Sequence, residues 1–274
     1  MAQNRIAVIG GGNLGTAIAR GLVAAAFCPP EAIIVTRRGD RSLAPLRAEG
    51  FRASTDNAIA VGEASVVVVA VRPAHVDEAL VSLAAALDPA RHVLISTVTN
   101  VRIAQIAARI ARPVPIVRAM PNIGVSVSES MTCLACGTDV PAPARDAAER
   151  LFSALGRTLF IEEEQMTPAT ALCACGIAFF LRAIRAASQG GVQVGFHADE
   201  AIRLAAQTAK GAAELILAHD AHPETLIDSV TTPLGVTIAG LNEMEHQGFS
   251  SALIRGIVVS AEKAERLYRA SNGE

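Results

Sequence analysis

The stretch Arg5-Ile-Ala-Val-Ile-Gly10-Gly-Gly12-Asn-Leu-Gly15 places a short apolar strand directly before a glycine-rich turn. The next residues, Thr16-Ala-Ile-Ala-Arg20-Gly-Leu-Val23, repeat apolar side chains at helical spacing. A strand, a Gly-x-Gly-x-x-Gly turn and a helix, in this order, predict a dinucleotide-binding βαβ unit. In such a unit the three glycines permit the tight turn, the approach of a pyrophosphate to the backbone and close helix packing. The alternative is a glycine-rich turn that binds no ligand.

The end of the second predicted strand bears on which nicotinamide cofactor would bind. This strand, Ala32-Ile-Ile-Val35, runs into Thr36, Arg37 and Arg38, and no acidic residue follows before Asp40. A site specific for NAD normally presents an Asp or Glu to the ribose here. Two guanidinium groups instead suit a 2′-phosphate. We therefore predict NADP(H), with NAD(H) bound at lower affinity, the alternative being that both arginines are solvated loop charges.

The composition favours a globular protein that associates with itself. The chain has 274 residues, of which 51% are hydrophobic and 18% charged, and its mean hydropathy is +0.38. This length suggests one or two domains, and the apolar content exceeds what we expect one monomer to bury. The most apolar run, Ala169 to Leu181, has thirteen residues, fewer than the roughly 20 that cross a bilayer. We predict a helix buried in an oligomer and no membrane span.

Charge and cysteine content exclude further classes of protein. The net charge is −2 and the chain has no block of Lys and Arg, so we expect no nucleic-acid partner. The N-terminal apolar run is interrupted at once by glycines and does not resemble a secretion signal, which predicts a cytoplasmic protein. Five cysteines argue against a disulfide framework, and their spacing does not fit zinc. We expect buried apolar thiols and no metal.

The remaining pattern predicts an α/β fold with two domains. Continuous apolar runs separated by Ala-rich helical segments are typical of a parallel sheet covered by helices. The predicted strands are 66–71, 92–97 and 115–118, with 131–136 and 157–161 at the sheet edge. The predicted later helices are 168–188, 198–218 and 249–270, with a break at Gly190-Gly191. We therefore expect a Rossmann-type, doubly wound, mostly parallel sheet over residues 1–164 and an all-α dimerisation domain over 165–274.

An acidic run, Glu162-Glu163-Glu164, lies at the predicted domain boundary. A run of like charges is most simply a solvated face. We therefore predict that these carboxylates lie on a solvated face.

Three further motifs accompany the glycine turn: Ala70-Val-Arg72-Pro73, Arg118-Ala-Met120-Pro121-Asn122 and Thr231-Thr232-Pro233-Leu-Gly235-Val-Thr237. Together they resemble the pyrroline-5-carboxylate reductase family, and the resemblance runs from Arg5 to about Leu267. It implies NADPH-dependent reduction of 1-pyrroline-5-carboxylate to L-proline, the last step of proline biosynthesis. It also implies a homodimer formed through the helical domain and, in larger assemblies, a ring.

The resemblance assigns cofactor-binding roles along the N-terminal domain. The residues so assigned, together with Arg38 from the strand-end argument, are Gly10, Gly12, Asn13, Leu14, Gly15, Thr36, Arg37, Asn57, Val71, Arg72, Pro73, Met120, Pro121 and Asn122. Arg72 stands where the family usually has Lys. For Pro73 and Pro121 the alternative is that each proline only ends the pairing of the strand before it.

The loop before a predicted helix is the expected substrate site. The residues assigned to it are Thr231, Thr232, Pro233, Gly235, Val236 and Thr237. Backbone N–H groups at a helix N-terminus favour a bound carboxylate. We predict Thr237 as the catalytic residue, whose hydroxyl would hydrogen-bond the ring nitrogen of the imine, and a helix cap is the alternative. Asp220 is a further candidate for a proton relay.

Two departures from the family pattern fall on the substrate side. The family's Ser-Gly-Ser-Gly-Pro-Ala-Tyr signature reads Cys173-Ala-Cys-Gly176-Ile-Ala-Phe179 here, and Leu234 replaces a glycine. Three functions therefore stay open: the pyrroline reductase, a reductase of a related cyclic imine or keto acid, and an NADP-binding protein without turnover.

Overall fold

The computed structural model describes residues 5–272, with side chains up to Arg266. The chain divides into two compact units. The first unit comprises the residues up to Cys175 together with those from Ser260 onward, and the second unit covers Gly176–Val259. The boundary at Glu164, which the change in sequence pattern predicts, stays a prediction.

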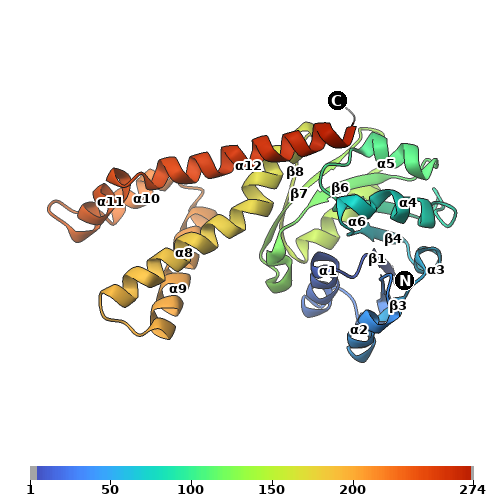
Figure 1. Cartoon of the computed structure of the whole chain (residues 1–274), viewed down its shortest axis with the longest axis horizontal. Coiled ribbons are helices and arrows are strands. Elements are labelled where there is room, and N and C mark those ends of the chain that lie inside the picture. Colours follow the sequence, from blue (N-terminus) through green and yellow to red (C-terminus); the bar gives the residue numbers. More distant parts are fainter. Residues whose placement is uncertain (1–4, 273–274) are drawn as a thin grey trace. The chain divides into compact units, whose positions relative to one another are not determined.

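The first unit is built on an eight-stranded sheet (Figure 1) with the strand order β3-β2-β1-β4-β5-β6-β7-β8. The strands from β1 to β6 are parallel, β7 is antiparallel to β6, and β8 is parallel to β7. The strands are β1 (Ile6–Ile9), β2 (Ile33–Thr36), β3 (Arg52–Ser54), β4 (Val66–Val69), β5 (Val93–Ser96), β6 (Ile116–Met120), β7 (Ser130–Cys136) and β8 (Gly156–Phe160). The predicted mostly parallel sheet is confirmed, and so are the two strands predicted at 131–136 and 157–161, which extend it as β7 and β8.

Helices cover both faces of this sheet. Successive residues of a strand point to opposite faces, so Val8 lies in one hydrophobic core with α1 and α6, whereas Ile9 lies in the other with α3, α4 and α5. The helices of this unit are α1 (Asn13–Ala24), α2 (Ala44–Ala48), α3 (Asn57–Glu63), α4 (Val76–Ala84), α5 (Ile103–Ile110), α6 (Ala142–Ser153) and α7 (Met166–Ala169). Short 3₁₀ turns are η1 (Pro30–Ala32), η2 (Asp40–Leu43), η3 (Pro73–His75), η4 (Ile123–Val127) and η5 (Glu163–Gln165). A π-helical turn, η6 (Thr170–Cys175), ends the unit.

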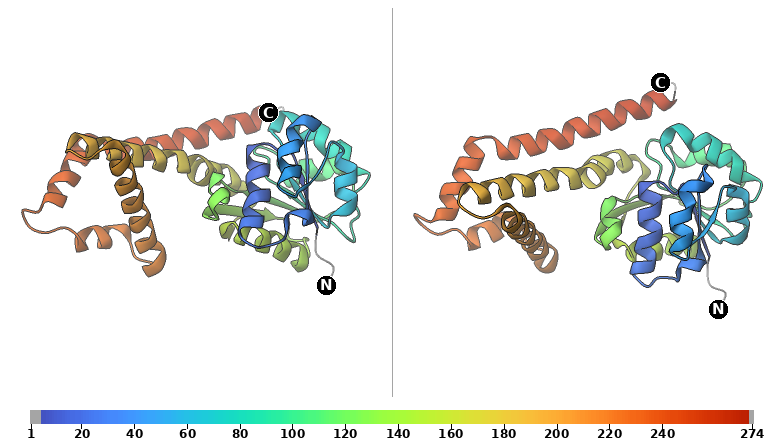
Figure 2. Two further views of the ribbon diagram at one scale, coloured as in Figure 1. Left: turned by 90° about the horizontal axis from the view of Figure 1, so that it is seen from below. Right: turned by 60° about the horizontal axis from the view of Figure 1, so that its bottom comes forward.

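The second unit is helical. Its elements are α8 (Gly176–Gln193), α9 (Ala198–His219), α10 (Pro223–Ser229), α11 (Val236–His246) and the first part of α12 (Phe249–Asn272). The helices α8 and α9 pack against each other (Figure 2). The predicted break at Gly190-Gly191 is wrong, because α8 continues to Gln193 and the chain turns at Gly195, where φ is +112°. A Cβ on Gly191 would lie 3.1 Å from that of Ala201, so this glycine lets α9 approach.

The apolar run at the start of this region belongs to a longer helix than the sequence indicated. The helical stretch Glu163–Gln193 has 31 residues. Its most apolar 18-residue window has a mean hydropathy of 1.6, and 17% of that window is buried. The argument that this segment is too short for a bilayer is therefore wrong, because it counted only the thirteen apolar residues and not the whole helix. Length and composition alone would allow a span, a test that core helices of soluble proteins also pass.

Candidate functional site

The glycine turn lies between β1 and α1, and two of its glycines are required by its own backbone. Gly10 has φ of +107°, and a Cβ there would lie 2.7 Å from the Ala70 carbonyl oxygen. A Cβ on Gly15 would lie 2.1 Å from the Gly10 carbonyl oxygen. Any larger residue at either position would displace backbone, so these two glycines would be needed with or without a ligand.

Gly12 is different, because the chain gives no reason for a glycine there. Its φ of −76° suits any residue, and a Cβ built on it would meet nothing within 4 Å. Gly12 is also the N-cap of α1, and within the described residues no side chain caps this helix. An open position next to the exposed N–H groups of a helix N-terminus is what a pyrophosphate needs. The residues present therefore fit a dinucleotide.

The end of β2 is tied to this turn through the backbone. The Thr36 carbonyl oxygen accepts hydrogen bonds from the N–H groups of Gly10 (3.2 Å) and Gly11 (2.7 Å). The Thr36 side chain is buried, whereas Arg37 and Arg38 are exposed. A guanidinium nitrogen of Arg38 lies 3.2 Å from Nε2 of His75, which follows β4 on η3. Two exposed cationic side chains thus follow β2, and their contact with a 2′-phosphate stays a prediction.

The residues predicted from the neighbouring strands meet at the same edge of the sheet. β1 lies between β2 and β4, and this is where the strand order changes direction, the usual position of a ligand crevice in such sheets. A Cβ on Gly10 would lie 2.8 Å from a methyl carbon of Val71, so the turn and the segment after β4 are in direct contact. Arg72 and Pro73 follow as exposed residues at the start of η3.

Asn57 is occupied by a contact within the fold. It is the first residue of α3, its side-chain amide donates to the Ser82 hydroxyl at 2.8 Å, and Asp56 caps the helix. A cofactor contact through its amide oxygen stays a prediction.

The segment after β6 is held by several hydrogen bonds of Asn122. Met120 is buried, and the next residues lead into η4. The Asn122 N–H donates to the Ser130 hydroxyl (3.1 Å), its side-chain amide donates to the Cys173 carbonyl (3.2 Å), and its side-chain oxygen accepts the Gly124 N–H (2.8 Å). Asn122 therefore joins β6 to the turn η6. Its side chain fixes this segment, and its contact with a nicotinamide stays a prediction.

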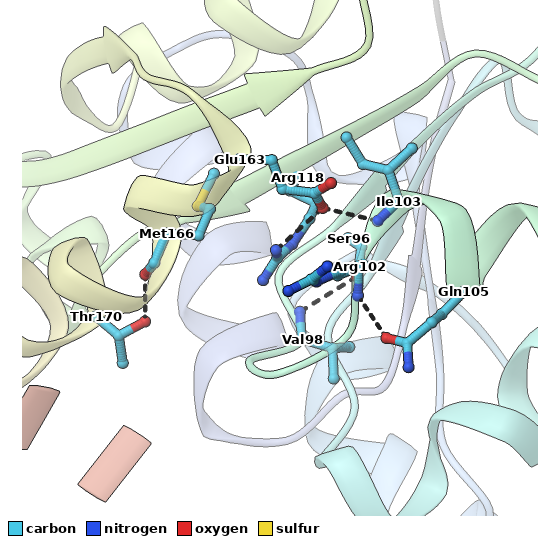
Figure 3. A network of polar contacts seen from close by, with 9 residues as sticks. All are labelled: Ser96, Val98, Arg102, Ile103, Gln105, Arg118, Glu163, Met166 and Thr170. Atoms are coloured by element: carbon cyan, nitrogen blue, oxygen red, sulfur yellow. Dashed lines mark hydrogen bonds and ion pairs between the residues drawn. The ribbon is translucent and has the colours of Figure 1, made fainter. Parts of the chain in front are cut away.

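A largely buried ion pair joins β6 to the turn η5 (Figure 3). The Arg118 guanidinium, 5% exposed, donates to Glu163 at 3.1 Å, and the same carboxylate oxygen accepts the Ile103 N–H at 2.7 Å. Burial lowers the pKa of Arg118, while the Glu163 charge acts in the opposite direction. The prediction of a solvated acidic run is therefore wrong for Glu163. Its partner lies 45 residues earlier in the chain, so no local pattern could reveal it.

The predicted substrate loop lies in the helical unit. Thr231 donates its hydroxyl to the Ile227 carbonyl at 2.7 Å, and the Gly235 N–H bonds to the Thr232 carbonyl at 2.9 Å. Gly235 is the N-cap of α11, so the alternative that Thr237 caps this helix is wrong. Thr237 is exposed in the first turn, and within the described chain no side chain caps α11. The loop thus offers open N–H groups, as an anion site requires.

Leu234, within this loop, has an unusual backbone conformation. Its φ is +61° and its side chain is fully exposed. A branched side chain in the left-handed region is unfavourable, which explains why glycine suits this position. Pro233 and Val236 beside it are also exposed.

Metal binding finds no support in the described part of the chain, where no group of three or more His, Cys, Asp or Glu side chains is placed to hold an ion. The five cysteines are free. The contacts of Ser130 and His75 were not predicted as site features, because single polar residues carry no pattern in the sequence.

A doubly wound sheet with an open glycine turn at its switch point defines the class of dinucleotide-dependent oxidoreductases. Two family models match: NADP oxidoreductase coenzyme F420-dependent over residues 5–100, and pyrroline-5-carboxylate reductase dimerisation over 163–267. The chain belongs to the pyrroline-5-carboxylate reductase family, as the resemblance predicted.

Individual relatives support this assignment. Pyrroline-5-carboxylate reductase 1 of Dictyostelium discoideum is 50% identical over 97% of this chain, which spans 50% of that protein's length. Pyrroline-5-carboxylate reductase 2 of the same organism is 45% identical, over 98% of this chain and 95% of the relative. A crystal structure of Plasmodium falciparum pyrroline carboxylate reductase with NADP bound has a TM-score of 0.87 at 22% identity, covering 98% of this chain and 99% of that one, which shows the same fold.

Proposed function

We propose that this chain catalyses the NADPH-dependent reduction of 1-pyrroline-5-carboxylate to L-proline in the cytoplasm. Membership of the family supports the reaction. The observation that carries it in this chain is Gly12, a glycine that the fold does not need and a bound dinucleotide does.

The N-terminal unit would hold the cofactor. The N–H groups that open α1 would bind the pyrophosphate, and Arg37 and Arg38 would bind the 2′-phosphate with charge-assisted hydrogen bonds. When bound, NADPH supplies the hydride. The protein's own contribution is then to orient the two reactants and to exclude water.

The loop before α11 would hold the substrate. The substrate carboxylate would accept hydrogen bonds from the N–H groups at the helix N-terminus. The helix dipole would stabilise the bound anion there by about 0.3–1 kcal/mol. Within the described residues no side chain is hydrogen-bonded to the Thr237 hydroxyl. This hydroxyl would hydrogen-bond the ring nitrogen of the substrate while that nitrogen takes up a proton.

The helical unit would form the homodimer. An apolar cavity of about 730 Å³ lies between α8 and α9, and its walls include Phe180, Ile184, Phe196 and Leu204. Phe180 and Leu204 are 58% and 50% exposed. Exposed apolar area of this kind is buried in stable dimers, and the dimerisation model covers the same residues.

The test is oxidation of NADPH, followed by absorbance, with 1-pyrroline-5-carboxylate as substrate and NADH in a parallel assay. Gly12→Ala is the informative variant, because the added methyl fits the free protein and would obstruct only the cofactor. We expect much weaker NADPH binding and only a small shift of the unfolding midpoint, since alanine is a poorer N-cap than glycine. Gly62→Ala is the matched control, since a Cβ there also meets nothing within 4 Å. Equal NADPH affinity in the wild type and Gly12→Ala would contradict the cofactor site.

A related cyclic imine or keto acid is the second candidate substrate. Leu234 favours it, since this exposed apolar side chain borders the proposed anion site. A competitor that inhibits pyrroline reduction and is itself reduced faster would identify this alternative. Tight NADPH binding without reduction of any imine would instead indicate a cofactor-binding protein.

A further inference from the structure

Two cysteines from distant parts of the chain meet in the first unit. Cys133 lies on β7 and Cys173 on the π-helical turn η6, and their sulfur atoms are 3.9 Å apart. Cys133 is buried with Met120, Ala135, Met166 and Ala169 in a small apolar cluster, against which Cys173 packs. The sulfur atoms of a disulfide are about 2 Å apart, so these two sulfur atoms must approach each other by roughly 2 Å to form the bond.

The pair lies beside the segment that we propose for the nicotinamide end of the cofactor. Cys133 is the register partner of Met120 across the β6–β7 ladder. The carbonyl oxygen of Cys173 accepts a hydrogen bond from the side-chain amide of Asn122, which follows Met120 by two residues. Any change at this pair of sulfur atoms therefore acts on both sides of the segment from Met120 to Asn122.

The two thiols differ in reactivity in the way that disulfide exchange requires. Cys173 is part-exposed, and a hydrogen bond from Cys133 lowers the pKa of Cys173 to about 7, against the opposing effect of burial. The same hydrogen bond, together with burial, raises the pKa of Cys133. Cys173 is thus the accessible thiolate that attacks first, and Cys133 is the protected thiol that resolves.

We propose that Cys133 and Cys173 form a reversible disulfide site that small-molecule disulfides oxidise, and that the bond lowers turnover. The Cys173 thiolate attacks one sulfur of a disulfide such as oxidised glutathione, which forms a mixed disulfide and releases one thiolate. Cys133 then loses its proton, and its sulfur attacks Cys173 Sγ and releases the second thiol. The protein loses two electrons and two protons, and the oxidant becomes two thiols.

The effect on turnover follows from the Asn122 contact and rests on the proposed function. Closing the gap brings the turn η6 and β7 together, which displaces the carbonyl that Asn122 binds. Catalytic geometry tolerates little such displacement. Cytosolic disulfides are usually transient and redox-sensing, which suits a site of this kind.

The test uses the full chain, reduced and then incubated with oxidised glutathione before free thiols are blocked. Peptide mapping by mass spectrometry should find one linked pair, Cys133 with Cys173, and three of the five cysteines blocked as free thiols. Dithiothreitol should reverse the bond. Cys133→Ala should abolish it, while Cys136→Ala, on the same strand, should not. If Cys133→Ala does not fold, Cys173→Ser provides the same test.

Turnover is measured on the same samples. Oxidation should lower the rate of the wild type several-fold and should not change the rate of Cys173→Ser, which lacks the attacking thiol and therefore forms neither the mixed disulfide nor the internal bond. A persistent mixed disulfide at Cys173, a different linked pair or five free thiols would overturn the site. A mapped disulfide without loss of turnover would overturn the effect on activity. The mapping needs no substrate, so failure of the proposed reaction stays distinguishable from failure of this site.

Discussion

Replacing Glu163 tests whether the buried ion pair stabilises the first unit. Glu163 accepts hydrogen bonds from Arg118 and from the Ile103 N–H, and Arg118 is 5% exposed. Removal of one partner of a buried pair costs about 3–5 kcal/mol, because the other charge stays buried. The Glu163 side chain is 24% exposed, so water compensates in part and we expect about 3 kcal/mol for Glu163→Ala.

Glu163→Gln separates charge from hydrogen bonding. The amide oxygen still accepts from both donors. The bond from the Arg118 guanidinium stays charge-assisted, whereas the bond from the Ile103 N–H becomes a neutral one. Hydrogen bonds to charged groups contribute about 1.5–3 kcal/mol and neutral ones about 0.5–1.5, which gives a loss of about 1–2 kcal/mol. The order should therefore be wild type, Glu163→Gln and Glu163→Ala, in falling stability.

Urea unfolding, followed by far-UV circular dichroism at one protein concentration, measures these differences. The fixed concentration matters because association would add to the apparent stability. Glu164→Gln is the matched control, since this neighbour is exposed, and it should change stability by less than about 0.5 kcal/mol. If Glu163→Gln and Glu163→Ala both match this control, the pair does not stabilise the fold.

The other predictions concern the cofactor, the substrate loop and the reactive thiol. Arg37→Ala with Arg38→Ala should weaken NADPH binding far more than NADH binding, because only NADPH carries the 2′-phosphate; equal loss in titrations with both cofactors contradicts this. Thr237→Ala should lower kcat and leave NADPH affinity unchanged, and unaltered turnover would remove this hydroxyl from the mechanism. Leu234→Gly should stabilise the fold by up to about 1 kcal/mol in thermal unfolding, because strain at φ of +61° is relieved, in part offset by unfolded-state entropy; a clear loss of stability argues against the strain. Alkylation of Cys173 by iodoacetamide should rise with pH around a midpoint near 7, because its pKa is lowered and the thiolate forms above that pH, whereas a midpoint near 9 would refute the shift.

The sequence predicted the central strands well because they are buried on both faces. Val66–Val69 is an unbroken apolar run with every residue buried, a pattern that is hard to mistake. The glycine turn was found because the order and spacing of its residues are local features of the sequence. Strand β3, with three part-buried residues at the sheet edge, carries no such pattern and was missed.

The errors arose where distant residues decide the structure. Gly190-Gly191 suggested a break because glycine disfavours a helix by about 1 kcal/mol. The close approach of Ala201 to Gly191 shows what the missing side chain permits. The substrate loop was predicted only through the family pattern, and Cys133 with Cys173 were predicted only as buried thiols, because their proximity depends on the tertiary fold.

The double hydrogen bond to the Thr36 carbonyl has a consequence for redesign of the cofactor preference. The backbone of residue 36 sets the position of the phosphate turn, whereas the side chains of Arg37 and Arg38 project from the loop that follows. In the proposed site, separate parts of the chain would therefore anchor the cofactor and discriminate between the two nicotinamide cofactors. An acidic residue at position 37 could exchange one nicotinamide cofactor for the other while the scaffold under the diphosphate keeps its shape.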